Sequence, residues 1–317
     1  MNTHASYCAK LLIASTIVAG AGKLAQFSSV GCDAFDRDRG DYMAYCNTPR
    51  HGHYDHAAFA YDLEPGVREN LQAANVLVLG SSHIQVALSS DALVAFERDH
   101  LSVKPYLMGF GYVEQDKFAA TVIAKLRPVP KIVIVNVDPF FADTESTEAL
   151  RLAKNPGIER ANAFAKRAWH GVSDAECGAG AAAIVVRFVC GRASTLYRSR
   201  ADGRWIFKEA RPFLDTLPTS PAVANEPSLA AAYALNAQRF LKALPVDRRC
   251  VVVTLVPDGY SSESIARAVA IRIGATFIAP QLTGLGSSDG SHLDTPSGER
   301  WSSAFLEALA PVLKACL

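Results

Sequence analysis

The sequence lacks several features that would place it directly in a functional class. Its 32 basic and 31 acidic side chains leave a formal charge of only +1, so the chain carries no electrostatic footprint for nucleic acid. The seven cysteines include no CxxC pair, which argues against a zinc ribbon or a thioredoxin-type redox site. Internal repeats are absent as well. What remains is an ordinary globular composition, 50% hydrophobic and 20% charged, in a chain long enough to bury a sizeable core.

Local ligand-binding motifs are also incomplete. The "GAGK" at 20–23 lacks the upstream glycine and the following Ser or Thr of a phosphate-binding loop. The "GAGAAA" at 178–183 has no strand before it, as a dinucleotide-binding turn would require. Three histidines, His51, His53 and His56, lie close together without supporting cysteine or carboxylate spacing, so we interpret them as part of a solvated loop. The sequence therefore predicts neither a metal ion nor a cofactor.

The N-terminus carries a short apolar run between two lysines. Residues 11–22 hold no charge, Lys10 precedes them and Lys23 follows. This run is shorter than the about 20 residues of a membrane-spanning helix. It fits the hydrophobic region of a secretory signal with a cleavage site at the small residues 19–21, while a signal anchor and a buried core helix are the alternatives. We therefore expect residues 1–30 to direct export, as a signal peptide or a signal anchor.

Export would place the cysteines in an oxidising compartment, where disulfides form. Cys177 and Cys190 flank an apolar segment, whereas Cys32 and Cys46 bracket a charged one. We expect a disulfide between Cys177 and Cys190, across a short loop. The sequence by itself does not fix the connectivity, and an odd number of cysteines leaves one thiol unpaired.

Five short runs rich in Val, Ile and Leu alternate with segments of helical period. The runs are residues 75–80, 104–109, 131–138, 250–256 and 275–279. The helical segments are residues 89–100, 116–126, 261–274 and 298–314. Strands that are almost continuously apolar and alternate with helices indicate a parallel sheet covered by helices on both faces.

Two other stretches interrupt this alternation. Residues 24–70 read as irregular and polar. Residues 142–247 contain two segments of helical period and a Pro/Ser-rich loop at 216–228. We interpret residues 142–247 as a long, mainly helical insertion between the third and fourth strands. Its "RSRADGRW" segment is read as a turn, with arginines that line a substrate cleft or belong to a solvated hairpin.

Small or polar residues stand where the predicted strands end. They are Ser82 after the first strand, Gly109 and Gly111 after the second, Asp138 at the end of the third, and Asp289 and His292 beyond the fifth. Ligands of such sheets bind beyond the carboxyl ends of the strands. These residue types meet the needs of acyl transfer, because a serine attacks, a histidine removes its proton and an aspartate orients the histidine. Glycine N–H groups would face the developing oxyanion.

Four short blocks resemble those of the SGNH (GDSL-type) hydrolase superfamily. The most specific is "DGSHLDTPSG" (289–298), which is similar to the family's DxxH block. The "VLVLGSSH" block places Ser82 at the nucleophile position, and "LMGFGY" resembles the second block. In the third block, "NVDP", Asp138 stands where the family has its oxyanion-hole asparagine. The "GSSHI" segment does not match the GxSxG elbow of α/β-hydrolases.

The resemblance covers roughly residues 75–140 and 248–315 and implies both a fold and an activity. The implied fold is a flavodoxin-like three-layer sandwich with a five-stranded parallel sheet, in a single domain over residues 31–317. The implied activity is that of a serine esterase, in particular a deacetylase, on O-acyl groups of cell-envelope or extracellular carbohydrate. The resemblance also implies a periplasmic protein, or one anchored in the inner membrane and facing the periplasm.

Two other functions fit the same scaffold. One is a polysaccharide O-acetyltransferase that receives acyl groups from a membrane acyltransferase partner. The other is a binding protein that keeps the fold without the chemistry. Catalysis would assign Ser82 as nucleophile, His292 as base and Asp289 as the orienting carboxylate, with Gly109 and Gly111 as oxyanion donors.

Asp138 poses a problem for catalysis, because an ionised carboxylate opposes the negative charge that develops in an oxyanion hole. Three solutions are open. Asp138 is protonated through burial, points away from the hole, or has another task such as binding a substrate hydroxyl. The neighbouring His83 is interpreted as a pocket or helix-start residue rather than as the base, since a residue adjacent to Ser82 normally points away from its side chain.

Overall fold

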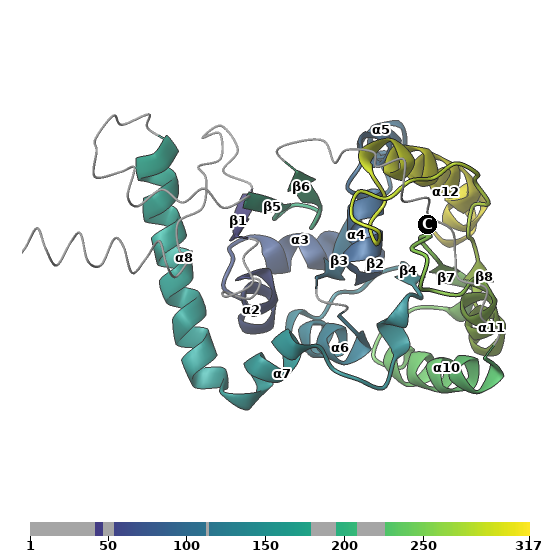
Figure 1. Ribbon diagram of the computed structural model, residues 1–317, viewed down its shortest axis with the longest axis horizontal. Helices are drawn as coiled ribbons and strands as arrows, with labels where there is room; N and C mark the ends of the chain where they lie inside the picture. Colours follow the sequence, from purple (N-terminus) through teal and green to yellow (C-terminus); the bar gives the residue numbers. More distant parts are fainter. Residues whose placement is uncertain (1–41, 47–53, 112–113, 179–194, 208–225) are drawn as a thin grey trace, which may run out of the picture.

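The computed structural model describes residues 42–46, 54–111, 114–178, 195–207 and 226–317 (Figure 1). Its centre is a five-stranded sheet between two layers of helices. The strands are β2 (Val76–Ser81), β3 (Pro105–Phe110), β4 (Ile132–Asn136), β7 (Val251–Thr254) and β8 (Thr276–Phe277). Every adjacent pair is parallel, and the order across the sheet is β3-β2-β4-β7-β8. The predicted α/β class with a five-stranded parallel sheet is confirmed.

The strand order places one point of this sheet in a special position. Numbered along the chain, the five strands lie in the order 2-1-3-4-5, which is the order of flavodoxin-like sheets. The chain moves outward from β2 to β3 and then returns to the other side of β2 with β4. The crevice between the carboxyl ends of β2 and β4 is therefore the switch point at which such sheets bind ligands.

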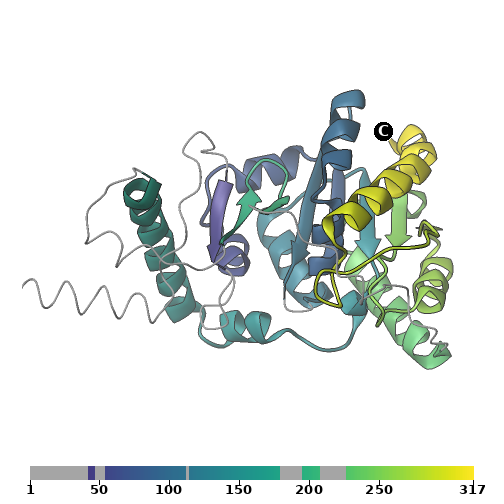
Figure 2. The same cartoon turned by 45° about the horizontal axis from the view of Figure 1, so that its top comes forward.

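Helices cover both faces of the sheet (Figures 1 and 2). One face packs against α4 (Ser82–Leu88), α5 (Asp91–Asp99) and α12 (Thr295–Cys316). The other packs against α2 (Tyr54–Tyr61), α3 (Val67–Ala73), α6 (Asp116–Leu126), α10 (Pro227–Leu241) and α11 (Glu263–Ile273). Two short 3-10 helices, η1 (Pro139–Phe141) and η2 (Arg248–Cys250), complete the framework.

Alternate residues of each central strand enter opposite halves of the core. In β2, Val76 and Val78 pack in the cluster that contains Trp301 of α12. Leu77 and Leu79 pack in the other cluster. Side chains of a strand alternate between faces, and here both faces are dry, so the run reads as continuously apolar. Full burial of each large apolar side chain contributes about 1.5–3 kcal/mol.

The connection from β4 to β7 is more than a helical insertion. It contains α7 (Thr147–Lys154) and α8 (Pro156–Gly178), which extends along one end of the molecule at the left of Figure 1. It also contains β5 (Thr195–Ser199) and β6 (Trp205–Phe207), which form an antiparallel sheet with β1 (Tyr42–Cys46) in the order β1-β5-β6. The final helix, α10, packs in the core as the crossover helix of the central sheet. The interpretation of residues 24–70 as irregular is also corrected, because β1, α2 and the start of α3 lie there.

The β5–β6 turn covers the edge of the central sheet at β3. The backbone N–H of Leu107 donates to the carbonyl of Asp202 at 2.7 Å, and Gln85 Nε2 donates to the carbonyl of Gly203 at 2.6 Å. Gly203 has a φ of +72°, and a Cβ there would lie 2.2 Å from the Leu107 oxygen. Only glycine allows this approach, which satisfies an otherwise open strand edge.

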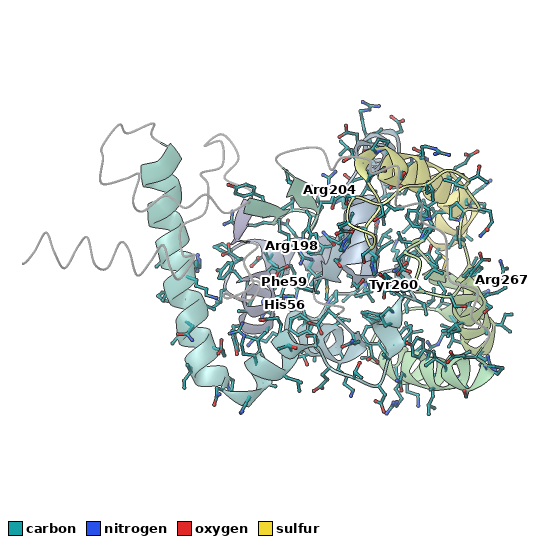
Figure 3. The ribbon with its side chains drawn as sticks, in the orientation of Figure 1. His56, Phe59, Arg198, Arg204, Tyr260 and Arg267 are labelled. Carbon is teal, nitrogen blue, oxygen red and sulfur yellow. A yellow bond between two sulfur atoms is a disulfide. The ribbon has the colours of Figure 1, made fainter. Side chains whose placement is uncertain are left out.

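A buried ionic network attaches the small sheet to the core. Arg198 of β5 is fully buried and donates from Nη1 to Asp55 Oδ2 at 2.9 Å. Its guanidinium lies 4.5 Å from the ring centroids of Phe59 and Phe110, a favourable cation–π arrangement. Figure 3 shows Arg198, Phe59 and His56 close together. The arginine is therefore a packing element of the fold rather than part of a substrate cleft or a solvated hairpin.

His56 belongs to the same network and not to a solvated loop. Its ring nitrogens contact Asp55 Oδ1 at 3.1 Å and Glu114 Oε2 at 3.0 Å. Burial by itself lowers the pKa of His56, but the hydrogen bonds and charges of Asp55 and Glu114 outweigh it and raise the pKa to about 9. His51 and His53 lie outside the described residues, within which no group of His, Cys, Asp and Glu is arranged to hold a metal ion.

A disulfide joins Cys250, next to β7, to Cys316 at the end of α12, with the Cα atoms 5.9 Å apart. It closes a loop across a sequence separation of 66 residues, and cross-links of that span contribute about 4 kcal/mol in the chain-entropy description. The expected Cys177–Cys190 pair and the N-terminal residues 1–30 lie outside the residues whose side chains are described. Among the helices that are described, none combines the length and apolarity that crossing a membrane requires.

The buried His56 should make the folded protein less stable at alkaline pH. Its folded-state pKa of about 9 lies above the ordinary 6.5, so its contribution is complete below pH 6.5 and is lost as the pH rises through 9. We expect the wild-type free energy of unfolding to fall by on the order of 3 kcal/mol more than that of His56→Gln over this range. Urea denaturation at pH 6.5, 8 and 9.5 measures the difference.

The matched control is His100→Gln, because His100 is exposed. Its pH curve should run parallel to the wild type. A parallel curve for His56→Gln would contradict the assigned ionisation of His56.

Candidate active site

The chain passes from β2 into α4 without an intervening loop. Gly80 has a φ of +149°, and a Cβ there would lie 2.7 Å from Ile84 Cγ2 and 2.9 Å from Asn136 Cβ. Ser81 is the N-cap of α4, and its hydroxyl accepts a hydrogen bond from His83 N at 3.2 Å. The turn therefore requires glycine for space and serine for capping, and it leaves Ser82 as the first residue of the helix.

Ser82 meets an Asp–His pair from the other end of the sequence. Its Oγ lies 2.8 Å from His292 Nε2, and His292 Nδ1 lies 2.7 Å from Asp289 Oδ2. Ser82 is partly exposed. The structure thus brings together the three residues that the sequence assigned to nucleophile, base and orienting carboxylate, at the carboxyl edge of the sheet.

The loop that carries the pair is folded tightly on itself. Asp289 Oδ1 accepts hydrogen bonds from the backbone N–H groups of Ser291 at 2.9 Å and His292 at 2.7 Å. Ser287 and Leu293 form an isolated antiparallel bridge. The carboxylate therefore fixes the backbone of the turn with one oxygen and the imidazole with the other.

Asp289 remains ionised in this setting. Partial burial alone would raise the pKa of its carboxyl, but the hydrogen bonds from the His292 ring and from the two backbone N–H groups hold the pKa well below its usual range. An ionised carboxylate suits the task of orienting an imidazole and stabilising the imidazolium.

The neighbouring Ser81 is not an alternative nucleophile. It is only 1% exposed, and its hydroxyl donates to Asp138 Oδ2 and lies 3.0 Å from His83 Nδ1. Ser81, His83 and Asp138 therefore form a second Ser–His–Asp set, which is buried next to the first. The Ser81 hydroxyl has no access to a substrate carbonyl.

Asp138 is found at the predicted strand end, yet not as an oxyanion donor. Its Oδ2 accepts from Ser81 and from His83 Nδ1, the latter at 3.0 Å. Its Oδ1 accepts from the N–H of Phe140 at 3.2 Å and caps η1. Of the three solutions considered for this residue, the contacts match a carboxylate with another task, and its partner is a histidine of this chain.

Gly109 lies within β3 and differs from its predicted role, whereas the role predicted for Gly111, directly after the strand, stays a prediction. The N–H of Gly109 donates to Gln85 Oε1 at 3.2 Å, so this donor is occupied within the fold. A Cβ at Gly109 would lie 2.7 Å from the Ser81 carbonyl oxygen, which shows that close strand packing requires the glycine. Gly111 is buried, and Tyr112 beyond it lies outside the described residues.

Three further residues complete the site: His83, which the sequence indicates only as a pocket or helix-start residue, and Asp258 and Ser291, to which the sequence assigns no role. His83 is buried, Asp258 lies in the turn after β7, and Ser291 lies between the members of the Asp–His pair. Burial by itself lowers the pKa of His83, but hydrogen bonding to Asp138 and the charges of Asp138, Asp258 and Asp289 outweigh it and raise the pKa. Ser291 is inside the "DGSH" block, whereas nothing in the local pattern indicates Asp258.

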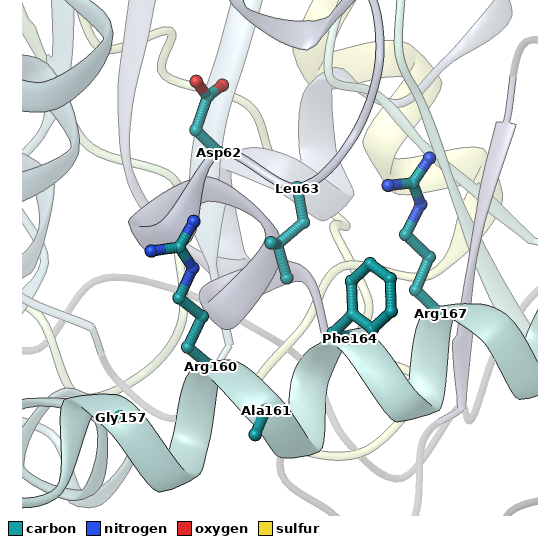
Figure 4. Close-up of a pocket in the computed structure, with 7 residues that line it drawn as sticks. All are labelled: Asp62, Leu63, Gly157, Arg160, Ala161, Phe164 and Arg167. Atoms are coloured by element: carbon teal, nitrogen blue, oxygen red, sulfur yellow. The ribbon is translucent and has the colours of Figure 1, made fainter.

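A separate cavity lies far from this chemistry in the fold. It has a volume of about 480 Å³ and opens between α8 and the end of α2 (Figure 4). Its lining residues are Asp62, Leu63, Gly157, Arg160, Ala161, Phe164 and Arg167. None of these side chains forms a nucleophile–base pair, so the Ser82 site remains the candidate active site.

The relay makes Ser82 the residue that a fluorophosphonate probe should modify. We expect one adduct, located by peptide mass spectrometry on Ser82, and its loss in Ser82→Ala. His292→Ala should slow the labelling, because the base no longer removes the serine proton. Ser303→Ala, at an exposed position of α12, is the control and should label like the wild type. An adduct on another serine would contradict the assignment.

Comparison of the chain with protein-family models, with curated proteins and with solved structures finds no match. The assignment of the site therefore depends on the geometry of Ser82, His292 and Asp289, together with the resemblance of the short sequence blocks around them.

Proposed function

We propose that this chain is a serine esterase that removes O-acyl groups from cell-envelope or extracellular carbohydrate. Ser82 is the nucleophile, His292 the general base and Asp289 the orienting carboxylate. The observation that carries the proposal is the continuous hydrogen-bonded relay, 2.8 Å from Ser82 Oγ to His292 Nε2 and 2.7 Å from His292 Nδ1 to Asp289 Oδ2. These distances fall within the reach that proton transfer needs.

In the acylation step, Ser82 Oγ attacks the ester carbonyl carbon while His292 Nε2 takes the hydroxyl proton. The negative charge of the oxyanion develops beside Ser82 at the N-terminal end of α4, where the helix dipole is positive. The carbon–oxygen bond to the sugar then breaks, and the departing oxygen takes the proton from His292. Water repeats the sequence on the acyl-Ser82 ester, releasing the carboxylic acid and restoring the serine.

The exposure of the relay favours water as the second nucleophile. The side chains of His292 and Asp289 are 24% and 53% exposed, so solvent reaches the base directly. An O-acetyltransferase must instead limit water at the acyl-enzyme. The transferase alternative and the non-catalytic alternative therefore become outcomes of the kinetic test rather than parts of the proposal.

The carbohydrate part of the proposal depends on export. Two features support export: the short apolar run at residues 11–22 and the disulfide between Cys250 and Cys316. Disulfides persist mainly in oxidising compartments such as the bacterial periplasm. Esters of envelope polysaccharides are accessible to an enzyme placed there.

Hydrolysis of p-nitrophenyl acetate tests the chemistry. We expect Ser82→Ala to reduce the rate of hydrolysis to background, and His292→Ala to reduce it nearly as far. Asp289→Ala should retain a rate roughly 10- to 100-fold higher than that of Ser82→Ala, because orientation of the base is partly replaceable. Ser303→Ala is the control, and circular dichroism verifies folding. Equal rates in Ser82→Ala and wild type would refute an esterase. A wild-type rate that rises only when a sugar acceptor is added would identify a transferase.

A fusion of alkaline phosphatase after residue 30 tests export separately. We expect phosphatase activity in the periplasm of a bacterial host, because the enzyme matures only where disulfides form. Deletion of residues 11–22 should abolish that activity. An inactive full fusion, retained in the cytoplasm, would remove the cell-envelope substrate and leave the esterase chemistry standing.

A further inference from the structure

His83, the residue after Ser82, makes hydrogen-bond contacts through both of its ring nitrogens on the buried side of the candidate active site. Its Nδ1 lies 3.0 Å from Asp138 Oδ2 and 3.5 Å from Asp258 Oδ2. Its Nε2 lies 2.7 Å from Ser291 Oγ. The ring centroid is 5.1 Å from that of His292. The imidazole therefore connects two buried carboxylates on one side to the Asp–His loop on the other.

The contact with Ser291 determines where the base stands. Ser291 lies between Asp289 and His292, and its backbone N–H donates to Asp289 Oδ1 at 2.9 Å. Holding the Ser291 hydroxyl thus holds the turn from which both members of the pair project. Because His83 directly follows Ser82 in α4, the same helical turn carries the nucleophile and anchors the loop of its base.

Two carboxylates make a charged His83 the favourable state. Asp138 and Asp258 are each 1% exposed, and a buried carboxylate is costly without a positive partner. Asp258 is also held by its own turn, through the N–H of Ser261 at 2.6 Å. An imidazolium donates from both nitrogens, which satisfies Asp138 and Ser291 at once.

We infer that His83 is a positioning residue, a buried imidazolium that clamps the loop of the Asp289–His292 pair through Ser291, with Asp138 as its counter-ion. This inference rests on the proposed function for its kinetic consequence. It also gives a reason for the aspartate in "NVDP". An asparagine at position 138 would retain an acceptor for Nδ1 but not the charge that keeps His83 protonated.

Kinetics of His83→Ala and Ser291→Ala test the clamp. We expect each to lower kcat for p-nitrophenyl acetate by roughly 10- to 100-fold with KM unchanged within about twofold, because a displaced base costs rate rather than binding. The double variant should be no slower than His83→Ala alone, since both changes remove one contact. His83→Gln should recover part of the rate, because its amide places a donor near the former Nε2.

His100→Ala is the matched control, because it removes an exposed histidine. Wild-type kcat in His83→Ala while Ser82→Ala is inactive would overturn the clamp and leave the esterase standing. Additive losses in the double variant would overturn it as well.

Asp138→Asn separates the two roles considered for that residue. If Asp138 is the counter-ion of His83, Asp138→Asn should lower kcat toward the level of His83→Ala. An equal or higher kcat would place position 138 in the oxyanion hole and overturn its assignment here.

Backbone hydrogen exchange tests the clamp without reference to catalysis. We expect faster exchange at the N–H groups of Ser291 and His292 in His83→Ala than in wild type or His100→Ala. This result would support the clamp even for a protein without esterase activity. Unchanged exchange at residues 287–293 would overturn it.

Discussion

The sharp passage from β2 into α4 is the constraint on which the site depends. A buried strand at the switch point of the sheet ends at Ser81, and the φ of +149° and the close neighbours of the preceding Gly80 exclude a larger residue there. The helix begins at the next residue, so consecutive side chains point in different directions. Ser81 and His83 are buried, whereas Ser82 between them is partly exposed. One turn of chain therefore supplies the helix cap, the proposed nucleophile and the proposed anchor of the Asp–His loop.

His83 and His292, whose ring centroids lie 5.1 Å apart, have different proposed roles because their surroundings differ. The side chain of His292 is 24% exposed and paired with an exposed carboxylate, and its Nε2 faces Ser82, with which the proposal has it exchange a proton. The side chain of His83 is 9% exposed and faces the buried carboxylates of Asp138 and Asp258. Exposure thus separates the proposed base, which must change its charge, from the proposed buried cation, which must keep it.

The sequence allowed prediction of the features that depend on local pattern. The apolar runs located all five central strands, and their ends led to Ser82, Asp289 and His292, because parallel strands bring their carboxyl ends to one edge. Features that depend on tertiary partners could not be read in this way. By sequence Asp138 resembles a misplaced oxyanion donor, whereas in the structure it pairs with His83, and Cys250 pairs across 66 residues with Cys316. The buried Arg198 likewise had no local signal for burial.

The loop of the Asp–His pair is fixed firmly at its base and more weakly at its tip. At the base, Asp294 caps α12 through the N–H of Ser297 at 2.7 Å, and Gly286 N donates to Ser297 Oγ at 2.8 Å. The helix that follows is secured by the packing of Trp301 in the core and by a disulfide at its far end. At the tip, internal hydrogen bonds shape the turn but do not attach it to the sheet. Two contacts with α4 provide an attachment there, one between Ser291 Oγ and His83 Nε2 and one between His292 Nε2 and Ser82 Oγ. Under the proposed clamp, the first contact makes the position of His292 relative to Ser82 depend on the buried charge of His83.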